Sequence, residues 1–435
     1  MSRRVVITGI GVISPLGNTP EKLWAALSSG TSGVRPLATI PGEVFSTRYG
    51  AEASDFTGSI EDFGPLDKAK SRTIKKNLKV MCREMQTGIA AAQLALADCK
   101  LPLGSVNLDR VGCVYGSDYM LTTPEEFTAA IRNCVDEQGQ FSFANWGEKG
   151  LGAVEPLWLL KYLPNLPASH IAIFNDLRGP NNSLTMREAS SNLAIAEAYS
   201  TIVRGHADAI LTGATGTKVH PARTIHVVTQ EEVAVHDGDP SKLSRPFDRN
   251  RAGAVLGEGA AAIMLEEMEY AQSRGAQILA EIVGFGSSAV SDLRGIGQYK
   301  NAFRNVLKQA IDRGRLKPDQ VGHINAHGLS SRRSDAEEAQ AIAEVFDGRR
   351  PPVPVVAAKS YFGNLGAASG LIELVGSVLA LKNNRLFRTL NYETPDPECP
   401  VNVVARDDVS PGDSFIKLSI TPQGQASAVA VRRFS

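Results

Sequence analysis

The chain has 435 residues, 43% of them hydrophobic and 21% charged, as expected for a globular protein with one large domain or two to three smaller ones. Lysine plus arginine equals aspartate plus glutamate at 46 each. This neutrality argues against nucleic acid or an anionic membrane as the main partner, because both need a basic surface, but it allows a small acidic carrier to bind at a local patch. No apolar run approaches the roughly 20 residues that span a bilayer. We therefore expect a soluble protein.

The cysteines are five in number and widely scattered, so a disulfide framework is not expected. No Cys-X-X-Cys pair or Cys/His cluster has metal-ligand spacing, so we also expect no metal site. Reduced thiols fit a cytoplasmic protein best. These residues are Cys82, Cys99, Cys113, Cys134 and Cys399.

The chain opens with MSRRVVITGIGVISPLG, in which two arginines precede apolar residues as they do in a signal peptide. The apolar run is short, contains two glycines and lacks a suitable cleavage site, so we expect a buried first strand instead. Gly9 and Gly11 lack the third glycine and the later acidic residue of a dinucleotide-binding fingerprint. They predict a tight turn at the end of this strand.

Continuous β-branched runs then alternate with helical patterns, which predicts an α/β fold with sheets between helices. Several strand runs lack in/out alternation, as is typical of central strands covered on both faces. The expected strands are Val5–Thr8, Val111–Tyr115, Ala209–Thr212, Ala260–Leu265, Ile278–Val283, Val321–Asn325, Val353–Ala357 and Phe415–Ile420. The expected helices are Pro20–Ser28, Lys79–Ala97, Ser191–Val203, Tyr299–Asp312, Ser334–Phe346 and Ala368–Lys382.

The sequence has two further features, a repeated short segment and an irregular region. The segment ITGIG near the start is echoed by IVGFG at residues 282–286, each expected to close a strand with a glycine turn, which hints at an internal duplication. Residues 116–167 are irregular and contain Trp146, Trp158 and several prolines. We interpret this region as an insertion that caps a pocket or packs at a subunit interface.

The stretch LTMREASSNLAIAEA, residues 184–198, places small residues before an Ala-rich helix, an arrangement that can present a nucleophile at a helix N-terminus. Glu188 stands where the nucleophile is expected. Ser190 and Ser191 are the alternative nucleophiles, although close helix packing also accounts for small residues here. Asp248 and Arg251, in the stretch SRPFDRNRAGAVLGEGA, are spaced to pair across a structural turn.

Polar residues follow two of the expected strands. His327 comes directly after Val321–Asn325, and an imidazole at that end of a central strand is well placed for a site. Lys359 and Asn364 follow Val353–Ala357. The Asn364 amide is suited either to donate to a developing oxyanion or to cap a helix.

Along nearly its whole length the chain resembles the β-ketoacyl-acyl-carrier-protein synthases of the thiolase superfamily. The resemblance is carried by VVITGIGVISPLG, by SRPFDRNRAGAVLGEGA, by NAHG with Asp335 and Glu338 after it, and by AAKS with the later GAASG. It implies an α/β, thiolase-like, five-layered αβαβα fold of two similar halves, residues 1–265 (with the insertion at about 116–167) and 266–435. It also implies a dimer whose substrates are carried on the phosphopantetheine arm of acyl carrier protein, with no cofactor of its own.

The family reaction is a decarboxylative condensation. A cysteine at a helix N-terminus takes the acyl chain as a thioester, while His–His or His–Asn assists loss of CO2 and backbone N–H groups form an oxyanion hole. Residue by residue, the family's Thr-Ala-Cys corresponds to Met186-Arg-Glu188, a register set by RGHAD at residues 204–208; a slip of one residue would place Ala189 there. His327 matches the first histidine and Lys359 the lysine, whereas Asn364 replaces the second histidine.

Two further segments depart from the family pattern. The glycine-rich gate Gly-Phe-Gly-Gly-Thr-Asn becomes PQGQAS at residues 422–427, so Gln423 replaces the gating phenylalanine. The Thr-Ser-Thr after the first histidine becomes Leu329-Ser-Ser. The scaffold motifs are therefore kept while the catalytic and gating positions differ.

A carboxylate cannot hold an acyl chain as a stable thioester, so we do not expect condensation by this chain alone. The first interpretation is a non-condensing subunit that resembles chain-length factors and pairs with an active synthase, with Glu188 salt-bridged to Arg187 or another cation because an unpaired buried carboxylate is expensive. The second is a malonyl-carrier decarboxylase that uses His327 and Asn364, with Glu188 protonated by burial. The third is a silent homodimer that binds acyl chains or the carrier.

Overall fold

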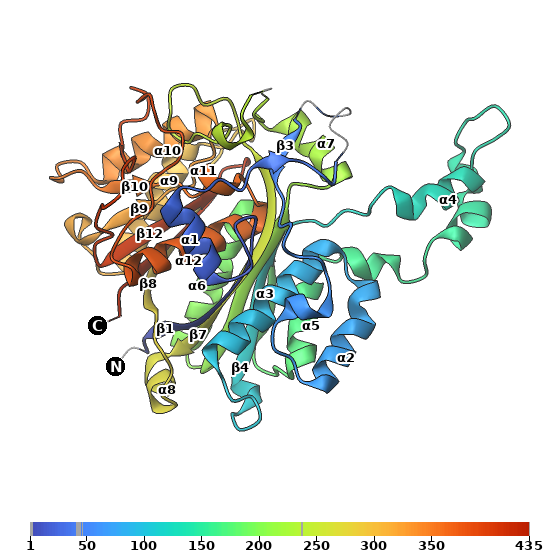
Figure 1. Cartoon of the computed structure of the whole chain (residues 1–435), viewed down its shortest axis with the longest axis horizontal. Helices are drawn as coiled ribbons and strands as arrows, with labels where there is room; N and C mark the ends of the chain where they lie inside the picture. The colour runs from blue at the N-terminus through green and yellow to red at the C-terminus, as the bar shows by residue number, and fades with distance from the viewer. Residues whose placement is uncertain (1–2, 41–44, 46, 236–237, 435) are drawn as a thin grey trace.

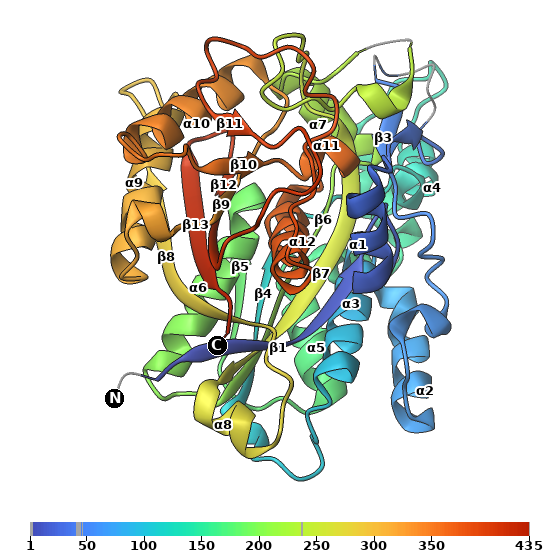
Figure 2. The same cartoon turned by 60° about the vertical axis from the view of Figure 1, so that its left-hand side comes forward.

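The computed structural model describes residues 3–40, 45, 47–235 and 238–434. Two groups of strands lie on either side of a central helical layer (Figure 1; Figure 2). That layer consists of α6 (Ser190–Val203) and α12 (Ser369–Lys382). One outer layer contains α3 (Arg83–Cys99) and α5 (Leu166–Asn175), and the other contains α9 (Tyr299–Arg313) and α10 (Arg332–Val345). This αβαβα arrangement confirms the predicted fold class.

The strands form one hydrogen-bonded path because β1 pairs with β7 along one edge and with β8 along the other. The N-terminal group runs in the order β1 (Val5–Ile13), β7 (Leu256–Glu267), β6 (Ala209–Thr217), β4 (Val111–Ser117) and β5 (Asn181–Thr185). The C-terminal group runs in the order β8 (Ala280–Ala289), β13 (Gln425–Arg432), β12 (Ser414–Ile420), β9 (His323–Asn325), β10 (Pro354–Val356) and β11 (Asn402–Val403).

The smaller elements lie around these layers. They are α1 (Pro20–Ser29), β2 (Arg35–Pro36), β3 (Tyr49–Ala51), α2 (Lys68–Asn77), α4 (Glu125–Asn133), α7 (Pro221–Gln230), α8 (Met268–Ser273) and α11 (Lys359–Phe362). Helix α1 shows why such elements form where they do. The Thr19 side chain caps its first turn, Pro20 opens it, and Gly30 ends it with a φ of 74°.

The predicted glycine turns are wrong, because Gly9 and Gly11 lie inside β1 and Gly284 and Gly286 lie inside β8. A Cβ atom at Gly11 would collide with backbone of α3, and one at Gly286 would collide with backbone of α9. The glycines therefore let a helix approach the strand closely instead of reversing the chain. The two segments that resemble each other in sequence thus have the same packing role in the two halves.

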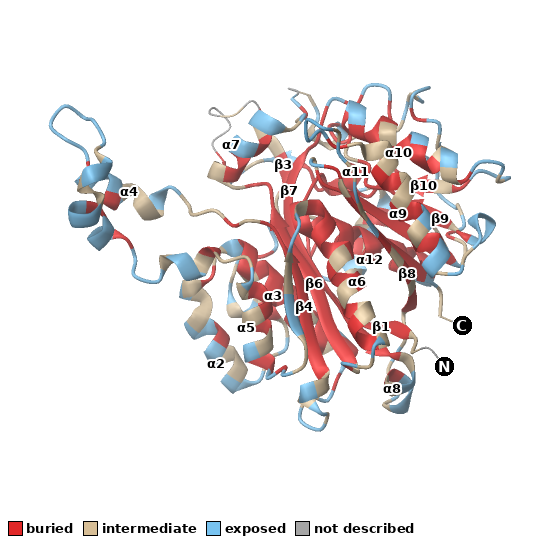
Figure 3. Cartoon of the chain, turned by 180° about the vertical axis from the view of Figure 1, so that it is seen from behind, coloured by how far each residue is buried: buried red, intermediate tan, exposed pale blue. Residues whose placement is uncertain are grey.

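The predicted boundary between the two halves of the chain, after Leu265, falls within β7, two residues before that strand ends. This boundary remains a prediction. Strands β1, β4, β6 and β7 are buried along their whole length, as their unbroken apolar runs suggested. Figure 3 shows this buried centre in red between the helical layers. Among the described residues, no helix is both long and apolar enough to cross a membrane.

The predicted insertion leaves the body of the molecule as an arm (Figure 1). Helix α4 and several short turns follow β4, and the chain returns to the body before α5. Large apolar side chains lie exposed on this arm, which Figure 3 shows mostly in the colours of exposed and half-buried residues. They are Ile131, Val135, Phe141, Phe143, Leu151, Leu157, Leu159 and Leu160.

Candidate functional site

The turn that was predicted to present a nucleophile forms at the N-terminus of α6, and we call its residues 186–190 the elbow. Arg187 has a φ of 50°, in the left-handed region that a side chain other than glycine rarely adopts, and a short 3-10 turn over Arg187–Ala189 leads into the helix. The Ser190 hydroxyl accepts from Met186 N at 2.8 Å and donates to Ser117 O at 2.8 Å. Both hydrogen bonds of the Ser190 hydroxyl therefore stabilise the elbow. Ser191 packs against Gly370 of α12.

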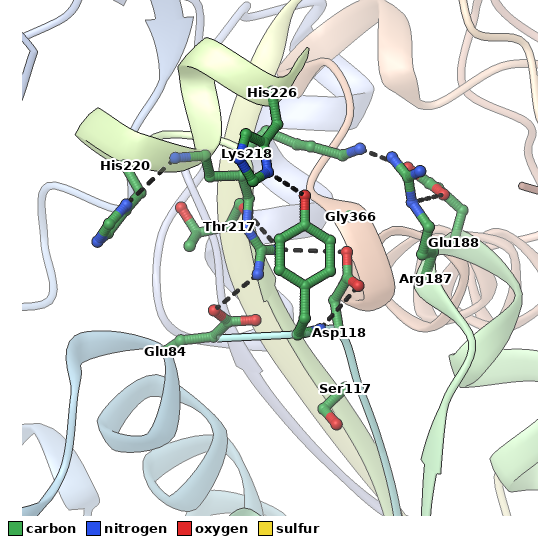
Figure 4. A network of polar contacts seen from close by, with 12 residues as sticks. Glu84, Ser117, Asp118, Arg187, Glu188, Thr217, Lys218, His220, His226 and Gly366 are labelled. Carbon is green, nitrogen blue, oxygen red and sulfur yellow. Dashed lines mark hydrogen bonds and ion pairs between the residues drawn. The ribbon is translucent and has the colours of Figure 1, made fainter. Parts of the chain in front are cut away.

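Glu188 is buried in a cluster of four charged side chains. Lys218 Nζ lies 2.8 Å from Glu188 Oε1 and 2.9 Å from Glu231 Oε1. Arg187 Nη2 lies 2.6 Å from the same Glu231 oxygen, and its Nε lies 3.7 Å from Glu188 Oε2. Two cations thus face two carboxylates, as Figure 4 shows in part. The predicted pairing of Glu188 with a cation is present, chiefly with Lys218.

These cations decide the charge of Glu188. Burial alone would raise the pKa of its carboxyl, but the charges of Lys218 and Arg187 and the hydrogen bond from Lys218 outweigh burial and hold that pKa well below its usual range. The same contacts raise the pKa of Lys218 although burial opposes its charge. Glu188 is therefore an ionised carboxylate at neutral pH, which contradicts the protonated form that the decarboxylase interpretation requires.

Asn364 both faces Glu188 and caps a turn. Its Nδ2 donates to Glu188 Oε1 at 3.1 Å, and its Oδ1 accepts from Gly366 N at 3.1 Å and from the Ser369 hydroxyl at 3.2 Å. The predicted capping role is present at the start of α12. Donation to a developing oxyanion stays a prediction, because the acceptor of the amide in this structure is the Glu188 carboxylate.

His327 lies beyond β9, at the end of the strand where it was predicted, and is buried. Burial, together with the charges of Lys359 and Lys417, lowers the pKa of its imidazole well below the usual value. His327 is therefore neutral at pH 7. Its Nδ1 lies 3.4 Å from Lys359 Nζ, and its carbonyl accepts from the same ammonium at 2.8 Å.

Glu373 in α12 holds two lysines at the bottom of the site. Its Oε1 lies 2.7 Å from Lys359 Nζ, and its Oε2 lies 2.5 Å from Lys417 Nζ. At most 1% of any of these three side chains is exposed. Burial lowers the pKa of Lys417 to about 8, against the attraction of Glu373.

Two carboxylates from the start of α10 fix the loop after His327. Glu338 accepts from His327 N at 2.6 Å and from Gly328 N at 2.8 Å. Asp335 accepts from Leu329 N at 2.9 Å and from Ser330 N at 3.1 Å. The acidic residues that follow NAHG therefore hold the backbone of the histidine loop, which satisfies donors that this buried loop would otherwise leave unpaired.

The side chains of Glu188, His327 and Asn364 line one cavity of about 110 Å³. Ala189 is not among the residues that line it, so Glu188 is the residue of the elbow that faces the other two. The remaining lining residues are Gln230, Glu231, Glu232, Tyr299, Leu329, Ser331, Ser334, Ile420, Thr421 and Pro422. This volume is well below the roughly 300 Å³ of the smallest ordinary ligand pockets. Lys359 lies behind His327 and does not line the cavity.

One sequence-based expectation is revised here. Asp248 and Arg251 do not pair through their side chains: Arg251 forms its ion pair with Asp396, while Asp248 lies 3.2 Å from Arg245 and accepts from three backbone N–H groups. The turn is still structural, since Arg251 Nη1 donates to Asp248 O at 3.0 Å. Gln423, at the predicted gate position, accepts from Arg187 Nη1 at 3.5 Å.

The sequence analysis missed Lys218, Glu231, Glu373 and Lys417. Lys218 offered one signal, because it directly follows the buried strand β6, where a charged residue is unusual. The other three lie in a loop, a helix and a strand with no distinguishing pattern. Within the described part of the chain, no group of three or more histidine, cysteine, aspartate or glutamate side chains could hold a metal ion.

Comparison with known proteins identifies the family of the chain. A model of the β-ketoacyl synthase N-terminal domain matches residues 2–271, and a model of the β-ketoacyl synthase C-terminal domain matches residues 279–393. The chain belongs to the β-ketoacyl synthase family. It is 31% identical to the 3-oxoacyl-acyl-carrier-protein synthase 2 of Synechocystis sp. over 404 residues, which are 92% of this chain and 91% of that protein.

Two solved structures show where the synthase fold recurs. A β-ketoacyl synthase from Burkholderia phymatum has 28% identity and a TM-score of 0.84, and the match covers 100% of both chains. The ishigamide ketosynthase/chain length factor has 24% identity and a TM-score of 0.82, again over 100% of both chains. The predicted resemblance and the thiolase-like fold are thereby confirmed.

Proposed function

We propose that this synthase homologue is a non-condensing, chain-length-factor-like subunit that pairs in the cytoplasm with an active ketoacyl synthase. The observation that carries the proposal is the carboxylate of Glu188, ionised and ion-paired at the start of α6. A carboxylate in that state cannot form the thioester on which condensation depends.

Three other features of the site support the absence of acyl transfer. None of the five cysteines lines the cavity within the described part of the chain. The cavity is too small for a long acyl chain, and the amide of Asn364 already donates to Glu188. A substrate carbonyl that used the Asn364 amide would therefore lie beside the Glu188 carboxylate.

The surface supports pairing with a second subunit. Strand β5 ends the strand path, so one of its edges has no strand partner among the described residues. Such an edge is a template for pairing with another chain. The arm adds a run of exposed apolar side chains, including Phe143 and Leu151, of the kind that marks protein interfaces. We propose that the synthase partner covers both, and that acyl carrier protein, named in the relatives, delivers its phosphopantetheine-bound substrates to the pair.

The test is co-expression with synthases that retain the cysteine, followed by native mass determination and an acylation assay. We expect a complex of one copy of each chain, in which an acyl group from the carrier increases the mass of the synthase alone. A covalent acyl group on this chain, mapped to residues 184–198, would overturn the proposal. A homodimer with every synthase tried would instead favour a silent acyl- or carrier-binding protein.

One observation favours a second function, the decarboxylation of malonyl groups on the carrier. His327, which is neutral, and Asn364 line the same cavity. The Glu188 carboxylate opposes this function, because it would repel the carboxylate of a malonyl substrate. Release of CO2 from malonyl-carrier that disappears in His327→Ala would establish the second function.

A further inference from the structure

Two cavities lie next to the charged cluster of Glu188, and no described residue lines both of them. The smaller one is the cavity of about 110 Å³ that Glu188 itself lines. Gln230 and Glu232 lie on its rim and are exposed, which places its entrance at the surface. The larger one, which we call the chamber, has a volume of about 520 Å³ and lies on the side of α3. A wall thus separates the two cavities, and its residues decide whether a ligand can pass.

Lys218 crosses this wall. Its neighbours in the chain, Thr217 and Val219, line the chamber. Its Nζ lies 2.8 Å from Glu188 and 2.9 Å from Glu231, and both of these carboxylates line the cavity. The side chain therefore reaches from the chamber to the cavity, and Figure 4 shows its path toward Glu188. Only 1% of this side chain is exposed, so protein surrounds it along its length.

The backbone that carries Lys218 is fixed by three hydrogen bonds. Lys218 N donates to Gly257 O at 2.8 Å, and Lys218 O accepts from the Thr224 hydroxyl at 3.1 Å. The preceding carbonyl, Thr217 O, accepts from Arg223 Nη1 at 3.0 Å. A shift of the main chain that moved Lys218 out of the wall would leave these buried groups unpaired, which is costly.

Charge holds the ammonium of Lys218 in place. On the cavity side, Arg187 Nη2 lies 2.6 Å from the same oxygen of Glu231 that Lys218 contacts. On the chamber side, the carboxylate of Asp118 already accepts from Arg223 Nη1 at 3.2 Å. An ammonium displaced in either direction would therefore compete with an arginine for its counter-charge.

The acid next to Arg223 offers no full counter-charge either. Glu84 Oε2 lies 3.8 Å from Arg223 Nη2, beyond hydrogen-bond distance. Burial raises the pKa of the Glu84 carboxyl to about 8, so this group is a neutral acid at pH 7. Lys218 is therefore most stable between Glu188 and Glu231.

A hydrocarbon chain cannot pass such a wall. It would have to separate Lys218 from Glu188 at a buried position, and it offers no hydrogen bond in return. The cavity is too small to hold a long chain, whereas the chamber is large enough and has apolar lining side chains, among them Met81, Met120 and Leu121. The wall therefore decides whether a long acyl group fits into this protein.

We propose that Lys218 closes the passage between the cavity of Glu188 and the chamber, and so excludes long acyl groups from this chain. This barrier is separate from the missing nucleophile: Glu188→Cys would supply a thiol without making room for an acyl chain. The inference rests on the proposed delivery of substrates on a phosphopantetheine arm, because the arm would enter from the surface through the cavity. A short acyl group meets no such barrier, since it needs no room beyond the cavity.

The test is isothermal titration at pH 7 with two thioethers, S-methylpantetheine and S-decylpantetheine. The variant that opens the wall is Glu188→Ala/Lys218→Ala, which removes one charge of each sign and keeps the pair of Arg187 with Glu231. We expect this variant to bind the decyl probe at least about tenfold more tightly than the methyl probe, because the chamber can then bury the decyl chain. The native chain and Glu188→Ala should show no such preference.

The matched control is Glu188→Ala/Arg187→Ala, which also removes one charge of each sign but keeps Lys218 beside Glu231. It should bind the two probes alike. A preference for the decyl probe in the native chain or in this control would overturn the proposal. Absence of the preference in Glu188→Ala/Lys218→Ala, including binding of neither probe, would also overturn it. If that variant does not fold, Glu188→Gln/Lys218→Ser replaces it with the same expectation.

Failure of this inference is distinguishable from failure of the proposed function. The probes are thioethers that form no covalent bond with the protein, so their relative affinities do not depend on whether the chain carries an acyl group or pairs with a synthase. An acyl group found on residues 184–198 of the native chain would overturn the proposed function. The preference between the two probes tests Lys218 alone.

Discussion

Lys218 Nζ lies 2.8 Å from the Glu188 carboxylate, and no more than 2% of either side chain is exposed. A charge at this depth is tolerated only with a counter-charge and hydrogen bonds, and here each residue supplies both for the other. Glu188 is thereby held as an anion at the position that the resemblance assigns to the family's reactive sulfur. If the proposed function holds, one ion pair links the stability of the fold to the loss of acyl transfer.

Replacing Glu188 should destabilise the protein. Glu188→Gln keeps the shape but leaves Lys218 and Arg187 to share Glu231, and breaking a buried pair in this way should lower the free energy of unfolding by about 3 kcal/mol. Urea unfolding followed by circular dichroism measures this change. Asp176→Asn, at an exposed pair with Arg178, is the control and should leave it almost unchanged. Equal stability of Glu188→Gln and the native chain would contradict the structure of the cluster.

The contribution of Glu188 should depend on pH. Its pKa in the folded state lies below the ordinary value of 4.5, so the unfolded chain binds its proton first as the pH falls. The stabilisation is therefore complete above about pH 4.5 and is lost as the pH falls toward the pKa of the folded state. In urea titrations between pH 3 and 7, the difference between the native chain and Glu188→Gln should shrink below about pH 4.5. A difference that grew on acidification would show that Glu188 is protonated in the fold.

Glu84 should show the opposite dependence. Its carboxyl keeps a proton in the fold up to a pKa of about 8, whereas the unfolded chain releases it near 4.5. Between these values the folded state binds the extra proton, so this group lowers stability as the pH rises, by up to about 1.4 kcal/mol per pH unit. Glu84→Gln should remove that slope and should therefore be more stable than the native chain at pH 8. Parallel stability curves for the two proteins from pH 5 to 8 would argue against the proton on Glu84.

Replacing Glu373 in α12, which holds the two buried lysines near His327, should strongly destabilise the protein. Glu373→Gln leaves the ammonium groups of Lys359 and Lys417 buried without their counter-charge, which should reduce the free energy of unfolding by about 3–5 kcal/mol. Thermal unfolding provides the measurement. Glu344→Gln, at a surface pair with Lys300, should barely change the melting temperature. Comparable melting temperatures for the two variants would mean that the buried lysines lose their charge instead.

The arm should matter for assembly and not for folding. Phe143 is 74% exposed, so Phe143→Asp should change the melting temperature of the isolated chain very little. The same change should weaken the complex with a synthase partner, because it places a charge in an apolar interface. Analytical ultracentrifugation of the mixed proteins measures this effect, with Gln138→Asp on the same arm as the control. Undiminished assembly of Phe143→Asp would remove the arm from the interface.

Much of the fold was predictable from local pattern. All eight expected strands and all six expected helices occur, because long apolar runs and 3.6-residue periodicity survive into the structure. Strand β5 was missed because its sequence NNSLT is polar and lies at an edge, and α7 was missed because Pro221 and a mixed composition hide its period. The glycine pairs of β1 and β8 were wrongly predicted to form turns, because a tight turn and a close contact with a helix both require glycine.

Only the site residues that belong to recognisable sequence motifs could be predicted. Glu188, His327 and Asn364 were expected together, and they do line one cavity. The pairing of Glu188 with Lys218 could not be read from the sequence, because the two residues lie 30 positions apart and meet only when β6 and α6 pack side by side. Burial of Glu84 beside Arg223 depends in the same way on contacts between distant elements.

The pairing of β1 has a consequence for how the protein is made. Val5 is the partner of both Glu267 and Ile282, so β1 lacks both neighbours until those later strands have been translated. Contacts of such long sequence separation form slowly, and apolar strands that wait for partners are prone to aggregation. We therefore expect β1 to bind chaperones during synthesis, until β7 and β8 are available to pair with it.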